Sequence, residues 1–292
     1  MSSPVTTKLN PAASVRSVER VVRGQPASDG AGVKLLRIIG SRDLPDLDPF
    51  LLLDEFRSDD AGDYIAGFPE HPHRGFETVT YMLAGRMRHG DNEGNTGLLG
   101  AGSVQWMTAG RGIVHSEMPE QQDGLMWGFQ LWVNLPAREK LTTPRYQDIA
   151  PERIPEVVLD SGGSVRVIAG EFNGTRGPVR ADATQPVYLD VRLPAGAGFN
   201  ALLPESHNAF VYVYEGELSI GQGEKPRIVK RGELAVLSQG LIAAAVAREA
   251  GVRFLVVAGH PLNEPVARYG PFVMNTPAEI RQALIDYQSG HL

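Results

Sequence analysis

The chain contains 292 residues, enough for two domains of ordinary size or one large one. Its hydrophobic fraction of 42% and charged fraction of 21% are typical of globular proteins, which excludes a chain that is disordered or collagen-like throughout. The net charge of −6 gives no positive field for nucleic acid or an anionic membrane surface. Because cysteine is absent, disulfides, thiolate metal sites, iron–sulfur clusters and cysteine nucleophiles are excluded as well.

The N-terminal region predicts neither export nor membrane insertion. Residues 1–14 read as a flexible polar leader and lack the apolar run of a secretory signal. Nowhere does the sequence hold about 18 uninterrupted apolar residues, the length that a membrane span needs. We therefore expect a cytoplasmic protein.

The body of the chain is typical of an all-β protein. Glycine and proline together account for 54 of the 292 residues (33 plus 21) and are spread through the chain, which indicates many turns between short strands. A proline-rich stretch, 136–156, interrupts these strands and is expected to be a linker. The expected strands before it include 33–39, 76–83, 104–107 and 127–133, and those after it include 165–168, 187–193, 210–214, 234–237 and 252–257.

The two halves of the chain resemble each other. HPHRGFETVTYMLAGRM (71–87) resembles HNAFVYVYEGELS (207–219), and GLLGAGSVQWM (97–107) resembles IVKRGELAVLS (228–238), at an offset of about 131–136 residues. This self-similarity favours a duplicated β-domain over a short-period solenoid. We expect one domain over 15–135 and a second over 157–275.

A single helix is expected at the C-terminus, over 276–292. Thr276, Pro277 and Glu279 fit an N-cap, a proline at the first helical position and a capping-box carboxylate. Apolar residues then recur at helical spacing, and Gly290 ends the pattern. The stripe, which should pack on a sheet, is formed by Ile280, Ala283, Leu284 and Tyr287.

Two pairs of polar residues carry the strongest chemical signal, and each pair is spaced i, i+2. His71 and His73 form one pair, and His115 and Glu117 form the other, 42 residues further along. On a strand, residues i and i+2 point to the same side, so two such pairs on neighbouring strands would direct four ligands into one cavity. Three imidazoles and a carboxylate suit a divalent first-row metal. A lone His-x-His pair is usually an ordinary surface or turn feature, but the second pair and the β-rich context favour a site.

Glu77 leaves three alternatives open. It follows His73 by four residues, so on an unbroken strand it would be a ligand or a carboxylate that orients one of the imidazoles. A bulge near Gly75 would instead turn it away. We favour the roles other than ligand, because Glu117 already completes a set of four protein ligands. His89 lies in a turn-rich stretch and is expected to be exposed to solvent.

Four segments resemble the signature blocks of the pirin family, which belongs to the cupin superfamily. The resemblance spans nearly the whole chain and implies a bicupin: two antiparallel β-barrels of the jelly-roll type, packed face to face, with a C-terminal helix. It also implies one metal, usually iron, in the N-terminal barrel, held by His71, His73, His115 and Glu117. The blocks are HPHRGFETVTY (71–81), QWMTAGRGIVHSEMP (105–119), FQLWVNLP (129–136) and PLNEPVARYGPFVMNT (261–276).

The sequence departs from the general cupin pattern in two ways. The germin type would use Glu77 as a ligand, whereas the pirin pattern uses Glu117. The second half has only His207 where the first has a pair, so we expect no metal there and a structural role for His207 and His260. Iron(II) is the expected ion, with manganese, cobalt, nickel, copper and zinc as alternatives.

The resemblance leaves two functions open. Some pirins have quercetin 2,3-dioxygenase activity, in which a flavonol and O2 react at the metal, the heterocycle is cleaved and carbon monoxide is released. Glu117 would then serve as ligand and as catalytic base. We expect Trp106, Trp127, Phe129 and Trp132 to belong to the core, unless one or two of them line the cavity mouth, where an aromatic substrate would stack. Pirins are also described as iron-dependent redox sensors that regulate a transcription factor or a metabolic enzyme. In that case the chain would bind a protein partner instead of a small substrate. We expect a monomer in either case.

Overall fold

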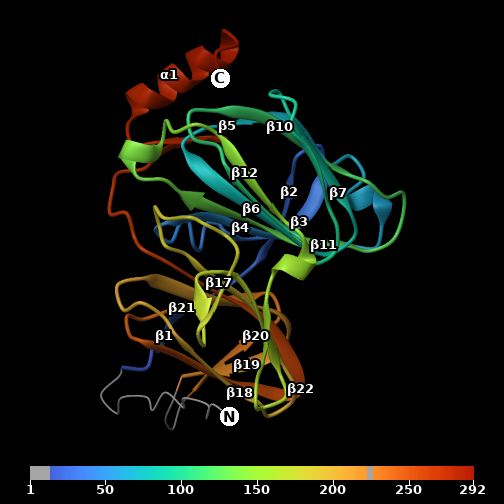
Figure 1. Ribbon diagram of the computed structural model, residues 1–292, viewed down its shortest axis with the longest axis vertical. Helices are drawn as coiled ribbons and strands as arrows, with labels where there is room; N and C mark the ends of the chain where they lie inside the picture. Colours follow the sequence, from blue (N-terminus) through green and yellow to red (C-terminus); the bar gives the residue numbers. More distant parts are fainter. Residues whose placement is uncertain (1–13, 222–225) are drawn as a thin grey trace, which may run out of the picture.

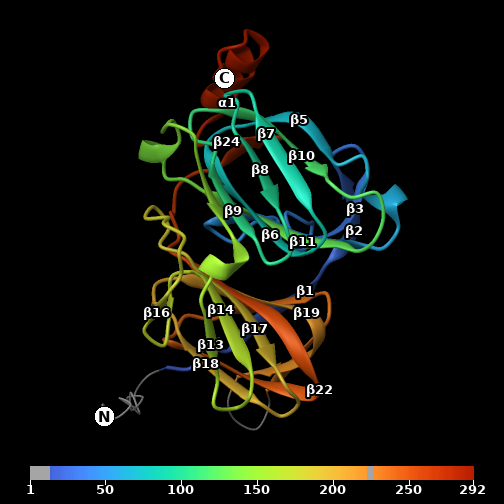
Figure 2. The same cartoon turned by 45° about the vertical axis from the view of Figure 1, so that its right-hand side comes forward.

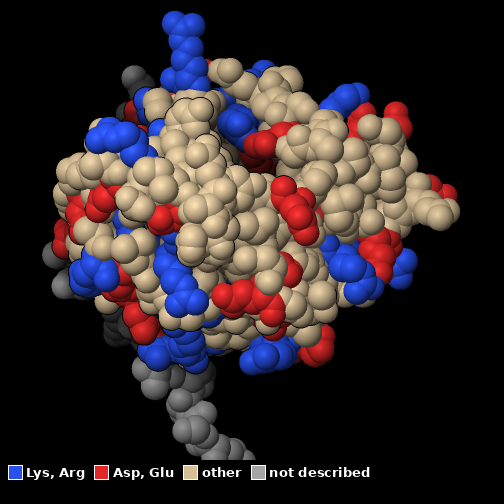
Figure 3. Space-filling view, turned by 90° about the horizontal axis from the view of Figure 1, so that it is seen from above, with Lys and Arg blue, Asp and Glu red and all other residues tan. Residues whose placement is uncertain are grey.

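The computed structural model describes residues 14–221 and 226–292. Two β-rich modules lie one above the other, and helix α1 (Pro277–Gln288) lies at the far end of the upper one (Figure 1). Positive and negative side chains are interspersed over the face that is seen from above (Figure 3). This face therefore carries no field of a single sign. No helix among the described residues has the length and apolar character needed to cross a membrane.

The first module is a sandwich of two antiparallel sheets. The larger sheet has the strand order β12-β9-β6-β11-β4-β3-β2, and the smaller has the order β5-β10-β7-β8. Both sheets are open, so the module is not one closed barrel. The strands are β2 (Gln25–Asp29), β3 (Val33–Ile39), β4 (Phe50–Ser58), β5 (Phe68–His73), β6 (Phe76–Ala84), β7 (Met87–Asp91), β8 (Thr96–Leu99), β9 (Val104–Thr108), β10 (Ile113–Pro119), β11 (Met126–Asn134) and β12 (Arg145–Ile149).

The second module is one nine-stranded sheet that folds around its own apolar core. The two long strands β19 and β22 run through both halves of this folded sheet. Register shifts near Gly216 let the paired strands bend. A small hairpin, β15 (Glu171–Phe172) with β16 (Thr175–Arg176), lies beside the sheet. The sheet contains β1 (Val18–Arg23), β13 (Glu156–Val158), β14 (Ser164–Ala169), β17 (Val187–Leu193), β18 (Gly198–Leu202), β19 (Asn208–Ile220), β20 (Arg227–Lys230), β21 (Glu233–Leu237) and β22 (Ile242–Gly259).

The largest apolar cluster lies between the two modules, with side chains from β4, β6 and β11 above and from β17, β19 and β22 below. Two buried carboxylates, one in each module, accept a hydrogen bond from a tyrosine of the other module. Glu55 of the first module accepts a hydrogen bond from the Tyr212 hydroxyl of the second. Asp190 of the second accepts one from the Tyr81 hydroxyl of the first, at 2.6 Å. The boundary is thus a shared core with satisfied polar groups.

Several segments pair with the module that they do not adjoin in the sequence. Strand β1, at the N-terminal end of the described chain, pairs with β21 of the second module. Strand β12 lies within the expected linker 136–156 but stays with the first module, where it pairs with β9. After the second module the chain returns to the first, where β23 (Ala267–Tyr269), β24 (Phe272–Met274) and α1 cover one end (Figure 2). There the Val273 amide donates to the Arg74 carbonyl at 3.0 Å. The N-terminal strand of the described chain therefore packs on the second module, and the C-terminal segment packs on the first.

Helix α1 confirms the prediction at the C-terminus. Thr276 and Glu279 form the capping box, and Pro277 is the first helical residue. Ile280 and Ala283 are buried against Phe272 and Met274 of β24. Only Tyr287 departs from the expected stripe, since 41% of it remains exposed. The predicted leader, 1–14, lies outside the described residues, apart from Ser14.

Candidate metal centre and its cavity

Three histidines converge on the inner face of the smaller sheet of the first module. His71 and His73 lie on β5, and His115 lies on the neighbouring antiparallel strand β10. His115 stands directly opposite His71 in the strand register, and His73 follows on the same face. The i, i+2 spacing read from the sequence thus brings three imidazoles together, as expected for neighbouring strands.

The three rings direct their Nε2 atoms toward one point. The Nε2 atom of His71 lies 3.0 Å from that of His73 and 3.1 Å from that of His115, and the three potential ligand atoms lie within 4.8 Å of one another. His71 Nδ1 lies 2.7 Å from the Pro69 carbonyl. Nδ1 therefore carries the proton, and Nε2 is left as an acceptor.

Burial favours the neutral form of the two inner histidines. His73 and His115 are 2% and 1% exposed. Burial, together with the neighbouring imidazoles, holds the pKa of each well below its usual value. A neutral imidazole is the form that binds a metal ion. The donor set, its convergence and its protonation state therefore fit a divalent cation.

Glu117 lies on the same strand as His115 but is held by the opposite sheet. Its carboxylate accepts hydrogen bonds from the Thr80 hydroxyl of β6 at 2.8 Å and from the Gln130 amide of β11 at 3.1 Å. Burial raises its pKa, and His71 and Thr80 oppose this shift. The group of ligand atoms within 4.8 Å of one another does not include Glu117.

Glu77 bonds elsewhere. Strand β5 ends at His73 and β6 begins at Phe76, so the strand is interrupted between the histidine pair and Glu77. Gly75 makes this turn with φ 88°, and a Cβ there would lie 1.9 Å from the Val273 carbonyl oxygen, so only glycine fits. Glu77 accepts a hydrogen bond from Thr108 at 2.7 Å and is not part of the three-histidine group.

The expectation that His89 is exposed was wrong. Only 1% of it is exposed, and it lies on β7 directly opposite Glu117. Its Nε2 atom lies 3.1 Å from an Asp148 carboxylate oxygen, and Tyr146 stacks on its ring at 5.3 Å. The turn residues that follow His89 belong to the β7–β8 hairpin. Side chains alternate along β7, which places Met87 and His89 on the inner face.

A cavity of about 550 Å³ opens beside the histidines. His71 and His73 form part of its wall, and Trp132 packs edge-on against His73 with ring centroids 5.4 Å apart. Trp106, Trp127 and Phe129 belong to the core instead. The remaining wall includes the apolar side chains of Leu35, Leu52, Phe56 and Phe68.

Charged groups from distant parts of the chain complete the cavity. Arg37 forms a 2.7 Å ion pair with Asp54, and the Arg268 guanidinium lies 4.8 Å from the centre of the Trp132 ring. Burial raises the pKa of Asp54 to about 6, although Arg37 favours its charged form. Sequence reasoning missed these residues, and also Thr80 and Gln130. The strand periodicity of 50–58 and 126–134 could have shown that Asp54 and Gln130 lie on one face, but no local signal connects them to Arg268.

Two models of known protein families match this chain. The Pirin family model matches residues 32–133, and the Pirin C-terminal cupin domain model matches residues 188–292. The chain belongs to the pirin family.

Relatives of this pirin cover nearly its whole length. A Pseudomonas aeruginosa protein that carries the provisional name quercetin 2,3-dioxygenase is 53% identical over 95% of this chain and 98% of its own. A pirin-like protein of Caulobacter vibrioides is 48% identical over 94% of this chain and 99% of its own. A crystal structure of quercetin 2,3-dioxygenase from Acinetobacter baumannii superimposes with a TM-score of 0.86 at 34% identity, over 95% of this chain and 98% of the other. The expected all-β bicupin fold is thereby confirmed.

Proposed function

We propose that this pirin is a metal-dependent dioxygenase that cleaves flavonols such as quercetin with O2, and that iron(II) is its metal. The observation that carries the proposal is the convergence of three imidazoles, two of which, His71 and His73, line a cavity of about 550 Å³. Pockets of about 300–1,000 Å³ are typical for small-molecule ligands. The names of its relatives support the same reaction class.

In this proposal, His71, His73 and His115 hold the metal and Glu117 is the fourth protein ligand. The bound ion would act as a Lewis acid toward the 3-hydroxyl of the flavonol and as an electron donor toward O2. The hydrogen bonds from Thr80 and Gln130 hold the Glu117 carboxylate in place. Glu117 would take the proton of that hydroxyl as a general base.

The cavity side chains orient the substrate. Trp132 lies in the cavity wall next to His73, and Phe56 and Phe68 line the same space. Aromatic walls of this kind favour a planar ring system. Arg268, held on Trp132, adds a positive charge to the cavity wall, which would favour the deprotonated form of a bound flavonol.

The alternative function, a redox sensor that regulates a protein partner, requires no substrate cavity. A sensor needs only electron transfer and a surface that responds to it, so a cavity of this size beside the histidines favours the enzyme. Absence of flavonol turnover would favour the redox sensor over the enzyme.

The test is steady-state turnover of quercetin by the iron-loaded protein and two variants of Trp132. We expect Trp132→Ala to raise KM about tenfold, because one aromatic contact is worth roughly 1 kcal/mol or more, whereas Trp132→Phe retains most of the affinity. Tyr287→Ala, an exposed aromatic of α1, is the control. Equal KM values for all four proteins would show that the substrate does not occupy this cavity.

A further inference from the structure

The second module contains a larger cavity that the proposed reaction does not use. Its volume is about 1,390 Å³, and all five residues of β18 line it. The β15–β16 hairpin and the loops that precede β17 and β19 complete the wall. Apolar side chains cover much of this surface, and some are well exposed, such as Leu202 at 57%. They include Leu159, Phe172, Val187, Phe199, Leu202, Leu203 and Ile242.

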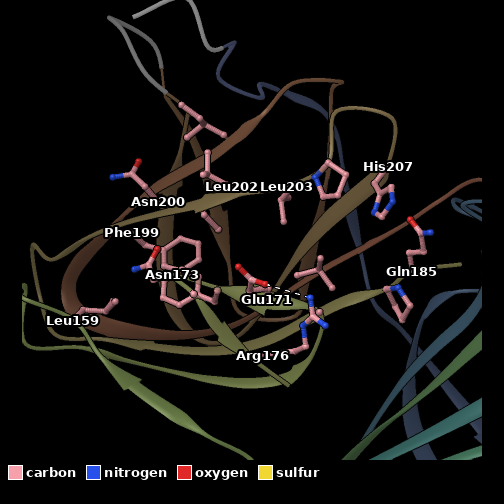
Figure 4. Close-up of a pocket in the computed structure, with 18 of the residues that line it drawn as sticks. Leu159, Glu171, Asn173, Arg176, Gln185, Phe199, Asn200, Leu202, Leu203 and His207 are labelled. Carbon is pink, nitrogen blue, oxygen red and sulfur yellow. Dashed lines mark ion pairs between the residues drawn. The ribbon is translucent and has the colours of Figure 1, made fainter. Parts of the chain in front are cut away.

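His207 provides a buried polar group at one end of this cavity (Figure 4). The side chain is 2% exposed, and its Nδ1 atom has no hydrogen-bond partner among the described residues. Buried polar atoms without a partner are rare in proteins and indicate a missing ligand or water. Gln185 lies beside His207 in Figure 4, with a positive φ of 45° that is uncommon for this residue type.

Arg16 holds the backbone of the loop that carries His207. The buried Arg16 guanidinium donates to the His207 carbonyl at 2.9 Å and to the Pro204 carbonyl at 2.7 Å. These two bonds clamp both ends of the loop that carries the imidazole. The polar group is thus held in place before any ligand arrives, which lowers the entropy cost of binding.

The charges around the cavity disfavour an anionic ligand. Glu171 and Arg176 pair with each other at 3.7 Å across the wall, as the dashed line in Figure 4 marks. The carboxylates of Asp160 and Asp182 outnumber the one further cation, Arg180, so an anion would be repelled. Burial lowers the pKa of His207 to about 4. Its neutral ring therefore has one nitrogen that donates and one that accepts.

We propose that this cavity is a second ligand site, which takes an uncharged aromatic alcohol and binds its hydroxyl group through His207. A hydroxyl can either donate or accept a hydrogen bond, so it satisfies an imidazole nitrogen in either tautomer. The flat surface of the stacked Phe172 and Phe199 rings, which lie 5.8 Å apart with an interplanar angle of 6°, contributes to the apolar wall. This proposal is independent of the reaction proposed for the first module.

The test is calorimetric titration of the full-length protein with 2-naphthol and with 2-naphthoate, its anionic counterpart. We expect 2-naphthol to bind at least tenfold more tightly than 2-naphthoate. His207→Phe should weaken 2-naphthol binding about tenfold, the effect of losing about one to two kcal/mol of hydrogen bonding. His260→Phe, which alters an exposed ring 5.9 Å from His207, should leave the affinity unchanged.

Two further variants locate the bound molecule. Leu202→Arg, at an exposed position of the wall, should weaken binding even if His207→Phe fails to fold. His71→Ala should have no effect, because His71 lines the other cavity. Failure of 2-naphthol to bind, equal affinity in the Leu202→Arg variant, or loss of binding in the His71→Ala variant would each overturn the proposal.

Discussion

At the scale of single residues, the site is built from two facing sheets. The small sheet supplies the three histidines and Glu117, and the large sheet supplies Thr80, which bonds to the carboxylate. Side chains that hold a ligand in place commonly affect metal affinity or activity by 10–100-fold. The position of the Glu117 carboxylate therefore depends on the large sheet as well as on its own strand.

We expect Thr80→Val to lower quercetin turnover about tenfold or more, because the isosteric side chain cannot donate to Glu117. Thr78→Val is the matched control, since Thr78 is equally buried on β6 and forms no such bond. Turnover rates and bound metal, measured together in both variants, check the expectation. Equal losses in the two variants would point to a general packing effect instead.

The candidate site shows how far residue patterns could predict the structure. The i, i+2 spacing was sufficient to bring His71, His73 and His115 together, because strand periodicity is local. It was not sufficient for Glu77, because a turn at Gly75 separates the strands. Composition alone led to the wrong prediction that His89 is exposed, because the polar residues around it include a strand with one buried face.

At the scale of elements, one buried lysine connects three segments at the end of the first module. The Lys140 ammonium donates to the Gly75 carbonyl at 2.8 Å, to the Asn134 side chain at 2.6 Å and to the Val273 carbonyl at 3.1 Å. It thereby ties the β5–β6 turn next to His73 to strand β24. Burial lowers its pKa to about 8.

This lysine gives a pH dependence of known sign. Between pH 8 and 10.5 the unfolded chain retains the Lys140 proton and the folded chain loses it, so the contribution of this residue to stability increases as the pH rises. The increase is at most about 3 kcal/mol. Urea unfolding of the wild type and of Lys140→Met at pH 7, 9 and 10 measures it.

We expect the difference in unfolding free energy between the wild type and Lys140→Met to grow with pH. Lys230→Met is the control, because the side chain of Lys230 is 63% exposed. A difference that is constant from pH 7 to 10 would contradict the shifted pKa of Lys140.

At the scale of the whole molecule, the two modules are expected to unfold together. Their largest core lies between them, and Tyr81 and Tyr212 each reach a carboxylate of the opposite module. The two tyrosines are 131 residues apart, the offset of the internal repeat. The repeat could be read from the sequence, but the exchange of β1 and β24 could not, because it depends on contacts between remote segments.

We expect Tyr81→Phe to destabilise the protein by about 1–3 kcal/mol, since buried Asp190 would lose one of its two tyrosine donors. In a chain of this size, this corresponds to a decrease in Tm of about 2–8 °C. Scanning calorimetry should still show one transition for the whole protein, and Tyr287→Phe should leave Tm unchanged. Two separate transitions in the wild type would refute the shared core.

The most direct test of the proposed dioxygenase is O2 consumption by the iron-loaded protein in the presence of quercetin, with His115→Ala as the comparison. His115 is buried and supplies one of the three converging nitrogens. We expect O2 uptake that matches quercetin loss mole for mole in the wild type and is absent in the variant, which should also bind no iron. Wild-type protein with iron bound and reduced, but with no uptake above that of the variant, would contradict the account.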